Sequence, residues 1–324
     1  MKFPKLSSPA ILSPMAGVTD VAFRALARGY GAGLTYTEFV SSAAIVRGNT
    51  SSLRMIKTDP SEKPVAVQLF GSNVEEVVEA ARFLEERFDI IDVNCGCPAW
   101  KVIKTGAGSE LLKKPEGIAE FINKLASAVS KPVTLKIRKG IDEGHVNAVE
   151  VAKLAEDAGA AAIAIHGRTQ KQHYSGRSNN EFIKNIKKEL TIPVIANGDI
   201  RDEKIAKHVL EYTQCDGLMI GRAAIGNPHI FRRIEHYLDS GELLPSQSLS
   251  ERLVDFFEYE ALCRRYKMLV FNDLMAKAMW FTKGIKNSRL VRVEINKAKD
   301  IDSILGIMKS LGDKTSDRPV QSVC

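Results

Sequence analysis

Short runs of apolar and β-branched residues recur along the first two thirds of the chain, and each is followed by residues with the spacing of an amphipathic helix. This helical spacing is clear at residues 73–88 and 115–129. The eight apolar runs are residues 10–14, 34–39, 64–70, 90–94, 133–138, 162–167, 193–198 and 216–221. Apolar strands that alternate with helices are typical of a parallel sheet covered by helices.

Eight strand–helix units in about 240 residues favour a closed barrel over an open, doubly wound sheet. No G-x-G-x-x-G sequence follows the first apolar run, which argues against a dinucleotide-binding fold of the Rossmann type. We therefore predict that residues 1–240 form an α/β domain of the (β/α)8 TIM-barrel class.

The pattern changes at residues 239–250, DSGELLPSQSLS, which read as a polar linker. We expect Ser250 to cap a helix in which Leu253, Phe257, Ala261 and Met268 share one face. Two more helices are expected near residues 273–284 and 294–310. We therefore predict that residues 241–324 form a small all-helical domain whose last dozen residues are disordered.

The composition is that of an ordinary globular protein, with 44% hydrophobic and 26% charged residues. No stretch approaches the roughly 20 apolar residues of a membrane span, and the N-terminus lacks the apolar core of a signal peptide. The five cysteines are too few and too scattered for a disulfide framework. We therefore expect a cytoplasmic protein.

Positive charge is concentrated in one part of the chain. The formal net charge is +7, and residues 261–299 hold ten Lys or Arg against two acidic residues. Such a stretch is either a solvated helical surface or a face that binds a polyanion.

The C-terminal ends of the strands carry the reactive groups in barrels of this kind. At least one polar residue or glycine stands at each of these ends. The residues there are Pro14, Met15, Ala16, Gly17, Glu38, Gln68, Asn94, Cys97, Lys136, Arg138, His166, Arg168, Asn197, Gly198, Asp199, Gly221 and Arg222. A complete ring of this kind predicts a binding site at the barrel mouth.

The chemistry of the ring suggests the ligand. Glycines that close the last two strands, Gly198 and Gly221, offer backbone N–H groups to a phosphate, and Arg222 adds charge. Gln68 and Lys136 suit the carbonyls and the N1 side of a flavin, where a cation stabilises the reduced anion. The alternative for Lys136 is a structural ion pair.

Two cysteines stand two residues apart in NCGCP, at positions 95 and 97. A zinc site would need two more soft ligands, and no second closely spaced cysteine pair exists, so we expect no metal. We expect Cys97 at the mouth end of the strand and Cys95 on the opposite side, without a disulfide between them. A thiol with a pKa of about 8.5 is mostly protonated at neutral pH, so Cys97 can donate a proton.

The sequence resembles the tRNA-dihydrouridine synthase family. The matching stretches are SPMAGVTDVAFRALARGYGAGLTYTE, VQLFG, DVNCGCPAWKVIKTGAGSELL, LKIRKG, AIHGRTQKQHYSG, IANGDI and GLMIGRAAIGNP, which cover the predicted barrel in order. The segment MWFTKGIKNSRLVRVEINKA resembles the helical tail of the family. PMAGVTD together with NCGCP is highly specific, because other flavin barrels rarely carry both.

The resemblance implies an oxidoreductase that converts uridine to 5,6-dihydrouridine in tRNA, with FMN as cofactor and NADPH or NADH as reductant. Hydride would reach C6 of the uracil from the flavin, and Cys97 would protonate C5. The resemblance and the ring together give the expected FMN contacts: Pro14, Met15, Ala16, Gln68, Lys136, His166, Asn197, Gly198, Asp199, Gly221 and Arg222.

We expect substrate contacts both in the barrel and in the C-terminal helical region. Asn94 and Arg138, with Lys136 and His166, are placed to hold the base and to spread the charge that builds on its C4 carbonyl. Lys283, Lys286 and Arg289 in the basic stretch are expected to bind the tRNA backbone, while no membrane or obligate protein partner is indicated.

One departure and two alternatives stay open. After HYSG the family often has a small residue, Asp and Trp, whereas this chain has RSNNEF, so the target uridine is left undetermined. A flavin-dependent dehydrogenase of a small pyrimidine-like molecule would leave the basic stretch unexplained. A non-catalytic RNA-binding barrel would leave Cys97 and the ring of expected flavin contacts at the barrel mouth unexplained.

Overall fold

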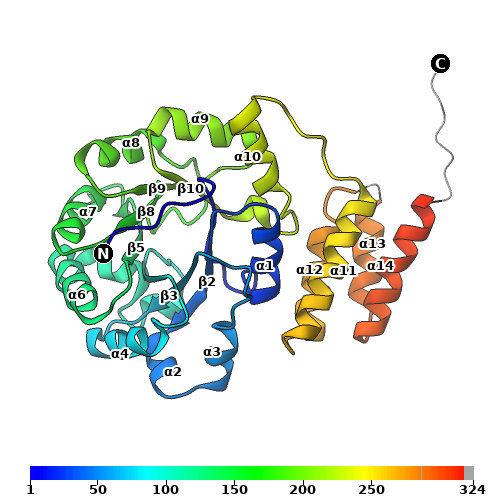
Figure 1. The fold of residues 1–324 in the computed structure, drawn as a ribbon, viewed down its shortest axis with the longest axis horizontal. Helices are drawn as coiled ribbons and strands as arrows, with labels where there is room; N and C mark the ends of the chain where they lie inside the picture. The colour runs from blue at the N-terminus through cyan, green and yellow to red at the C-terminus, as the bar shows by residue number, and fades with distance from the viewer. Residues whose placement is uncertain (286, 317–324) are drawn as a thin grey trace.

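The computed structural model describes residues 1–285 and 287–316, and its largest part is a closed parallel barrel (Figure 1). The barrel strands are β1 (Ala10–Leu12), β2 (Leu34–Ser41), β3 (Val65–Phe70), β4 (Ile90–Cys95), β5 (Val133–Arg138), β8 (Ala162–His166), β9 (Val194–Asn197) and β10 (Gly217–Ile220). They pair in chain order around the barrel, and β1 closes it against β10. The predicted TIM barrel and its eight strands are confirmed, with ends that differ by one or two residues.

Helices surround the barrel strands on the outside (Figure 1). They are α1 (Val21–Gly29), α2 (Ser42–Val46), α3 (Thr50–Met55), α4 (Val74–Leu84), α5 (Trp100–Ile103), the 3-10 helix Gly108–Lys113, α6 (Pro115–Ala128), α7 (Ala148–Asp157), α8 (Asn180–Glu189), α9 (Glu203–Thr213), the 3-10 helix Arg222–Ala224 and α10 (Ile230–Ser240). A two-stranded hairpin, β6 (Gly140–Asp142) and β7 (His145–Val146), follows β5 and was not expected from the sequence.

The interior of the barrel changes character along its axis. Its lower end is filled by apolar side chains such as Ile11, Leu34 and Ile90, all of them buried. Gln68 and Asn94, nearer the C-terminal ends of β3 and β4, are also buried but polar. The apolar layer supplies the packing, and the polar layer forms the base of the mouth.

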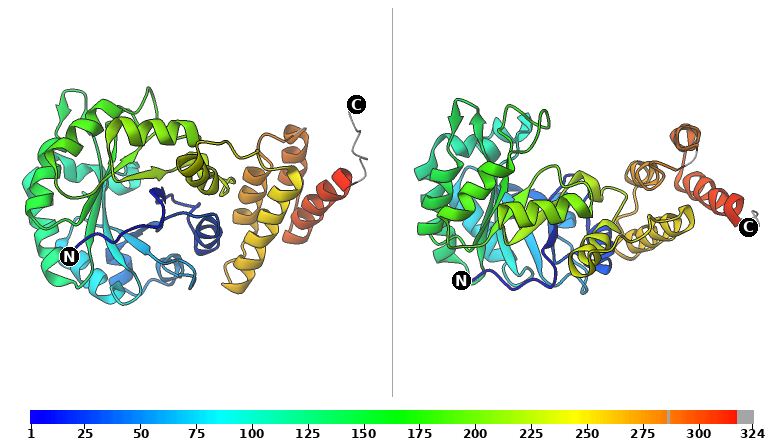
Figure 2. Two further views of the ribbon diagram at one scale, coloured as in Figure 1. Left: turned by 45° about the horizontal axis from the view of Figure 1, so that its top comes forward. Right: turned by 90° about the horizontal axis from the view of Figure 1, so that it is seen from above.

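Four helices follow the linker and gather at one side of the barrel, next to α1 and α10 (Figures 1 and 2). They are α11 (Leu249–Arg265), α12 (Phe271–Phe281), α13 (Ser288–Lys297) and α14 (Ile301–Ser316). The part of residues 241–316 that the structure describes contains no strand. An all-helical C-terminal region is therefore confirmed.

The predicted start of α11 is wrong, and its predicted packing face is right only for Leu253, which is buried, and Phe257, which is partly buried. Ser248, not Ser250, is the N-cap, because Ser248 and Glu251 form a reciprocal capping box. The buried face carries Phe256, Tyr259 and Cys263, while Ala261 is exposed and Met268 lies beyond the helix end. The face that meets the barrel includes polar groups, so an apolar pattern alone did not locate it.

The predicted single helix at residues 294–310 is two helices. Ala298 is extended between α13 and α14, and Asp300 accepts a hydrogen bond from the Ser303 N–H at 2.7 Å, which caps the new helix. The predicted disorder of the last dozen residues is wrong for the part up to Ser316, because α14 extends to that residue. Residues 317–324 lie outside the described residues.

A buried lysine joins the helical region to the barrel. Lys277 on α12 is 1% exposed, and its ammonium donates to the Gly17 carbonyl at 2.7 Å and to the Val18 carbonyl at 3.3 Å. It also pairs with Asp20 at 3.2 Å, which accepts a second bond from the Tyr259 hydroxyl at 2.9 Å. Lys277 therefore does not belong to the solvent-facing charge of the basic stretch.

Candidate active site

A cavity of about 850 Å³ opens at the C-terminal end of the barrel strands. Most of the predicted site residues line it: Pro14, Met15, Ala16, Gln68, Asn94, Cys97, Lys136, Arg138, His166, Asn197, Gly198, Asp199, Gly221 and Arg222. Lys283, just after α12, also lines it, so the helical region contributes to the mouth. Arg289 is exposed on α13 and is not one of the lining residues, and Lys286 lies outside the described residues.

A chain of hydrogen bonds crosses the floor of the cavity. Asp92 accepts from the Gln68 amide nitrogen at 2.7 Å, and Gln68 Oε1 accepts from the Asn94 amide nitrogen at 2.8 Å. Asn94 Oδ1 then accepts the backbone N–H of Cys97 at 2.9 Å. Because an ionised carboxylate only accepts, Asp92 fixes the orientation of both amides.

Asp92 was not singled out from the sequence. Its side chain is fully buried and also accepts from the Thr134 hydroxyl at 2.5 Å. Burial raises the pKa of Asp92 to about 6 against these hydrogen bonds, so the carboxylate is still mostly ionised at neutral pH. The alternation of β4 places Asp92 and Asn94 on the same face of the strand, a spacing that could have indicated the pair.

The predicted placement of Cys95 and Cys97 on opposite sides of one strand is wrong, although the two cysteines do differ in exposure. Residues two apart on a strand share a face, and β4 ends at Cys95, so strand alternation does not separate them. The chain turns at Gly96, which leaves Cys95 buried and Cys97 partly exposed on the cavity, both as free thiols. Burial raises the pKa of the Cys97 thiol above its usual value, despite the nearby Arg138 and Lys136, so it holds its proton at neutral pH.

The loop after Cys97 is tied back on itself. The Cys97 carbonyl accepts from the Ser109 hydroxyl at 2.9 Å and from the Ser109 N–H at 3.1 Å. Gly108 has φ +65°, and a Cβ there would lie 2.8 Å from the Cys97 carbonyl oxygen. A glycine is therefore required at this position for the loop to close over Cys97.

Two cations from β5 reach the mouth. Lys136 donates to the Asn197 amide oxygen at 2.9 Å, and no carboxylate among the described residues forms an ion pair with it, so the alternative of a structural ion pair is not what these residues show. Burial and the charge of Arg138 lower the pKa of Lys136 to about 8. Lys136 is therefore protonated at neutral pH and loses its charge at mildly alkaline pH.

Arg138 is buried and holds loops together. Its guanidinium donates to the carbonyls of Gly96 at 2.9 Å, Thr169 at 2.8 Å and His173 at 3.0 Å. Burial lowers the pKa of Arg138 to about 10, which still leaves it charged at neutral pH. One side chain thus connects the Cys97 turn to the loop after β8, in addition to lining the cavity.

His166 is a neutral group among cations. Burial, together with Lys136, Arg138 and Arg168, lowers the pKa of His166 far below its ordinary value, so the imidazole is uncharged at neutral pH. It can then both donate and accept a hydrogen bond.

Three predicted mouth residues, Gly17, Glu38 and Arg168, are not among the residues that line the cavity. The Gly17 N–H donates to Glu38 at 2.5 Å, and the buried Arg168 donates to Asp199 at 2.7 Å. Burial alone would raise the pKa of Asp199, but hydrogen bonds from the Ser178 N–H and from Arg168 lower this pKa below its ordinary value. These residues hold the loops that present the lining.

The ends of β9 and β10 leave backbone exposed to a ligand. Gly198 has φ +126°, and a Cβ there would lie 2.3 Å from the Ser178 hydroxyl oxygen, so no larger residue fits. Arg222 lies 3.3 Å from Asp199, with its guanidinium 4.5 Å from the centre of the Tyr174 ring. With the cations and amides of the mouth, this donor set is chemically suited to a flavin that carries a phosphate.

Several lining residues were not predicted individually. Phe39, His173, Tyr174 and Arg201 face the cavity from loops or strand ends. His173 and Tyr174 lie within the AIHGRTQKQHYSG stretch, but their position depends on how Arg138 folds that loop back.

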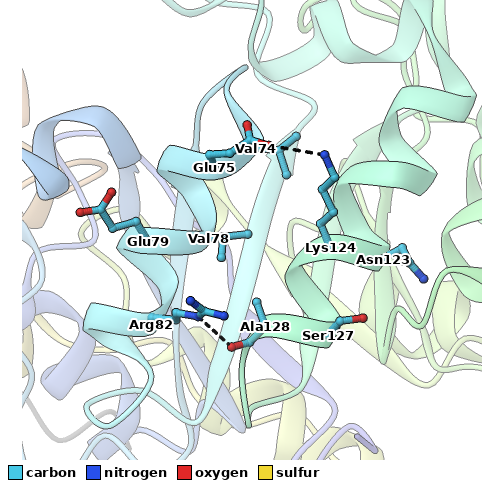
Figure 3. Close-up of a pocket in the computed structure, with 9 residues that line it drawn as sticks. All are labelled: Val74, Glu75, Val78, Glu79, Arg82, Asn123, Lys124, Ser127 and Ala128. Atoms are coloured by element: carbon cyan, nitrogen blue, oxygen red, sulfur yellow. Dashed lines mark hydrogen bonds and ion pairs between the residues drawn. The ribbon is translucent and has the colours of Figure 1, made fainter.

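A second hollow lies on the outside of the barrel, between α4 and α6 (Figure 3). Its volume is about 690 Å³, and it is crossed by contacts between Glu75 and Lys124 and between Arg82 and the Ala128 carbonyl. These are ordinary exposed helix-to-helix contacts, and the groove lies away from the residues of the mouth.

Two further findings concern metals and membranes. The described residues contain no cluster of three or more His, Cys, Asp or Glu that could hold a metal ion. Within the same residues, every helix is too short or too polar to cross a bilayer.

The closed barrel and the cavity at its mouth define a (β/α)8-barrel enzyme. The Dihydrouridine synthase (Dus) family model matches residues 11–311, and the chain belongs to this family.

Curated relatives agree with this assignment. The chain is 47% identical over 256 residues to tRNA-dihydrouridine synthase B of Yersinia pestis, covering 78% of this chain and 79% of the relative. It is 48% identical over 250 residues to the Escherichia coli protein of the same name, covering 76% and 77%. The Pseudomonas aeruginosa protein of that name is 42% identical over 302 residues, covering 92% and 91%.

Solved structures show the same fold at low identity. Histamine dehydrogenase from Rhizobium sp. 4-9 matches with a TM-score of 0.56 and 13% identity, over 79% of this chain and 49% of that chain. TcOYE with pHBA matches with a TM-score of 0.54 and 12% identity, over 75% of this chain and 91% of that chain. These matches support the barrel fold alone.

Proposed function

We propose that this protein reduces uridine to 5,6-dihydrouridine in tRNA, with FMN as cofactor and NADPH or NADH as reductant. Its family membership supports the reaction. The observation that carries the proposal is the position of Cys97, a protonated thiol on the wall of a cavity that also holds Asn94, Lys136 and His166.

The FMN site would be formed by residues at the C-terminal ends of six strands. These are Pro14, Met15, Ala16, Gln68, Lys136, His166, Asn197, Gly198, Asp199, Gly221 and Arg222, all of which line the cavity. Bound FMN would supply the hydride that reduces the uracil. Lys136 would stabilise negative charge on the ring, and the backbone at Gly198 and Gly221 would face the phosphate.

The other mouth residues would act on the base. Asn94 would hold the uracil edge, since Gln68 and the Cys97 turn fix its amide. The charge of Arg138 and the neutral imidazole of His166 would stabilise the developing charge on the C4 carbonyl. Cys97 would then donate its proton to C5.

The two regions of the chain would have different functions. The barrel, residues 1–240, would carry out the reduction, and the helical region, residues 241–324, would bind tRNA. Lys283 supports this division because it belongs to the helical region and lines the cavity. Reaching a stacked uridine requires drawing it out of the tRNA at a cost of a few kcal/mol, which phosphate contacts would offset. We expect this reaction to take place in the cytoplasm.

The test is to map dihydrouridine in tRNA from cells that lack this protein. We expect at least one position to become unmodified and to regain dihydrouridine when the gene is restored. Unchanged dihydrouridine throughout would contradict the proposal. NADPH oxidation stimulated by orotate-like compounds but not by tRNA would favour a small-molecule dehydrogenase, and a purified protein without flavin would favour a non-catalytic barrel.

A further inference from the structure

An exposed tryptophan stands beside the cavity. Trp100 is 74% exposed, among the highest values of any large hydrophobic side chain in the described residues. It follows Pro98 and Ala99, which line the cavity, and it is three residues from Cys97. A large aromatic ring that is exposed at the edge of a binding site is available to contact a ligand there.

The ring is presented by an anchored segment. Trp100 begins α5, whose Val102 side chain is buried, and the Lys104 N–H donates to the Trp100 carbonyl at 3.0 Å. The Thr105 carbonyl after α5 accepts from the Ser72 hydroxyl at 2.7 Å. The backbone under Trp100 is therefore tied to both the barrel and the Cys97 turn.

The surroundings of Trp100 carry positive charge. Lys101 and Lys104 on the same short helix are exposed, and neither forms an ion pair with another described residue. The exposed Tyr174 also lines the cavity, under the guanidinium of Arg222. An exposed aromatic ring next to the unpaired Lys101 and Lys104 fits an unstacked base and its flanking phosphates.

We propose that Trp100 stacks on an unpaired base of the tRNA next to the extruded uridine, and that Lys101 and Lys104 contact the flanking phosphates. This inference rests on the proposed function. Drawing one uridine into the cavity exposes the face of a neighbouring base, and Trp100 covers that face. The ring thereby stabilises the extruded state and places the target nucleotide over Cys97.

The test compares Trp100→Ala and Trp100→Phe with Phe83→Ala, using an unmodified tRNA transcript. Phe83 is also an exposed aromatic, 53% exposed, but it lies near the C-terminal end of α4, away from the mouth. Loss of one base stack should raise KM and Kd for tRNA by about 5- to 150-fold in Trp100→Ala. Trp100→Phe should retain most of the affinity, and Phe83→Ala should match the unaltered protein.

Fluorescence gives a second measurement on a variant that keeps its aromatic ring. The chain has two tryptophans, and tRNA should quench the emission of the unaltered protein much more than that of Trp100→Phe. Equal quenching in both, or unchanged tRNA affinity in a folded Trp100→Ala, would overturn the inference while dihydrouridine formation persists. If the unaltered protein forms no dihydrouridine, the proposed function itself fails, and this inference fails with it.

Discussion

At the scale of single residues, burial sets the charge state of each reactive group at the mouth. Cys97 keeps its proton, His166 stays neutral and Lys136 stays charged, although all three lie on one cavity. A proton donor, a neutral hydrogen-bonding ring and a cation can therefore coexist at neutral pH.

The lowered pKa of Lys136 gives a prediction for pH. Its ammonium is charged below about pH 8 and neutral above, so the affinity of the flavin-free protein for FMN should begin to fall near pH 8. An ordinary lysine would keep its charge to about pH 10. FMN fluorescence titrations at several pH values measure this. Lys136→Met should bind FMN more weakly with no fall across that range, and an identical pH profile in both proteins would exclude Lys136 from the site.

The site residues at strand ends could be predicted from the sequence, because the register of a parallel barrel brings all those ends to one face. The roles of Asp92 and Arg138 could not be predicted in this way. Asp92 orients Gln68 and Asn94 from below, and Arg138 ties the Cys97 turn to the loop after β8. These roles depend on contacts between segments far apart in the sequence, which no local pattern encodes.

At the scale of elements, the strands were predictable and the C-terminal helices less so. Both faces of a barrel strand are buried, so a strand such as β10, GLMI, appears in the sequence as a short apolar run. The inner face of α11 instead carries Asp255, Tyr259 and Glu260. Asp255 accepts a hydrogen bond from Tyr30 of the barrel, and such polar docking leaves no helical apolar pattern to follow.

Lys277 gives a prediction for the joint between the helical region and the barrel. Lys277→Met removes the donor to Gly17 and Val18 and leaves Asp20 without its cation, so the free energy of unfolding should fall by about 3 kcal/mol. Denaturant titration measures the loss. Lys283→Met, an exposed lysine after the same helix, should change it by no more than about 0.5 kcal/mol. Equal, small losses in both would show that the buried pair contributes little.

At the scale of the whole molecule, charge and cavity meet where the helical region joins the barrel mouth. Lys283 lies in the cavity wall, and Arg289 is exposed on the next helix, while the buried Lys277 takes no part in this surface. A tRNA placed over the mouth would therefore touch both regions.

This arrangement predicts how tRNA binding depends on salt. Each lost phosphate contact lowers the slope of log K against log salt by about 0.7–0.9, so Lys283→Glu with Arg289→Glu should flatten it by about 1.5 units. The matched control is Arg87→Glu with Lys188→Glu, two exposed cations near the opposite end of the barrel. Binding measured at several salt concentrations should show no change of slope in the control. Equal slopes in both double variants would place the tRNA elsewhere.

The most direct test of the account is nucleoside mass spectrometry on unmodified tRNA incubated with the FMN-loaded protein and NADPH. We predict that the unaltered protein forms dihydrouridine, that Cys97→Ala forms it about 10²–10⁴ times more slowly, and that Cys95→Ala remains nearly as active. This outcome follows because only Cys97 faces the cavity with its proton in place. The absence of dihydrouridine with the unaltered protein, or an active Cys97→Ala beside an inactive Cys95→Ala, would contradict it.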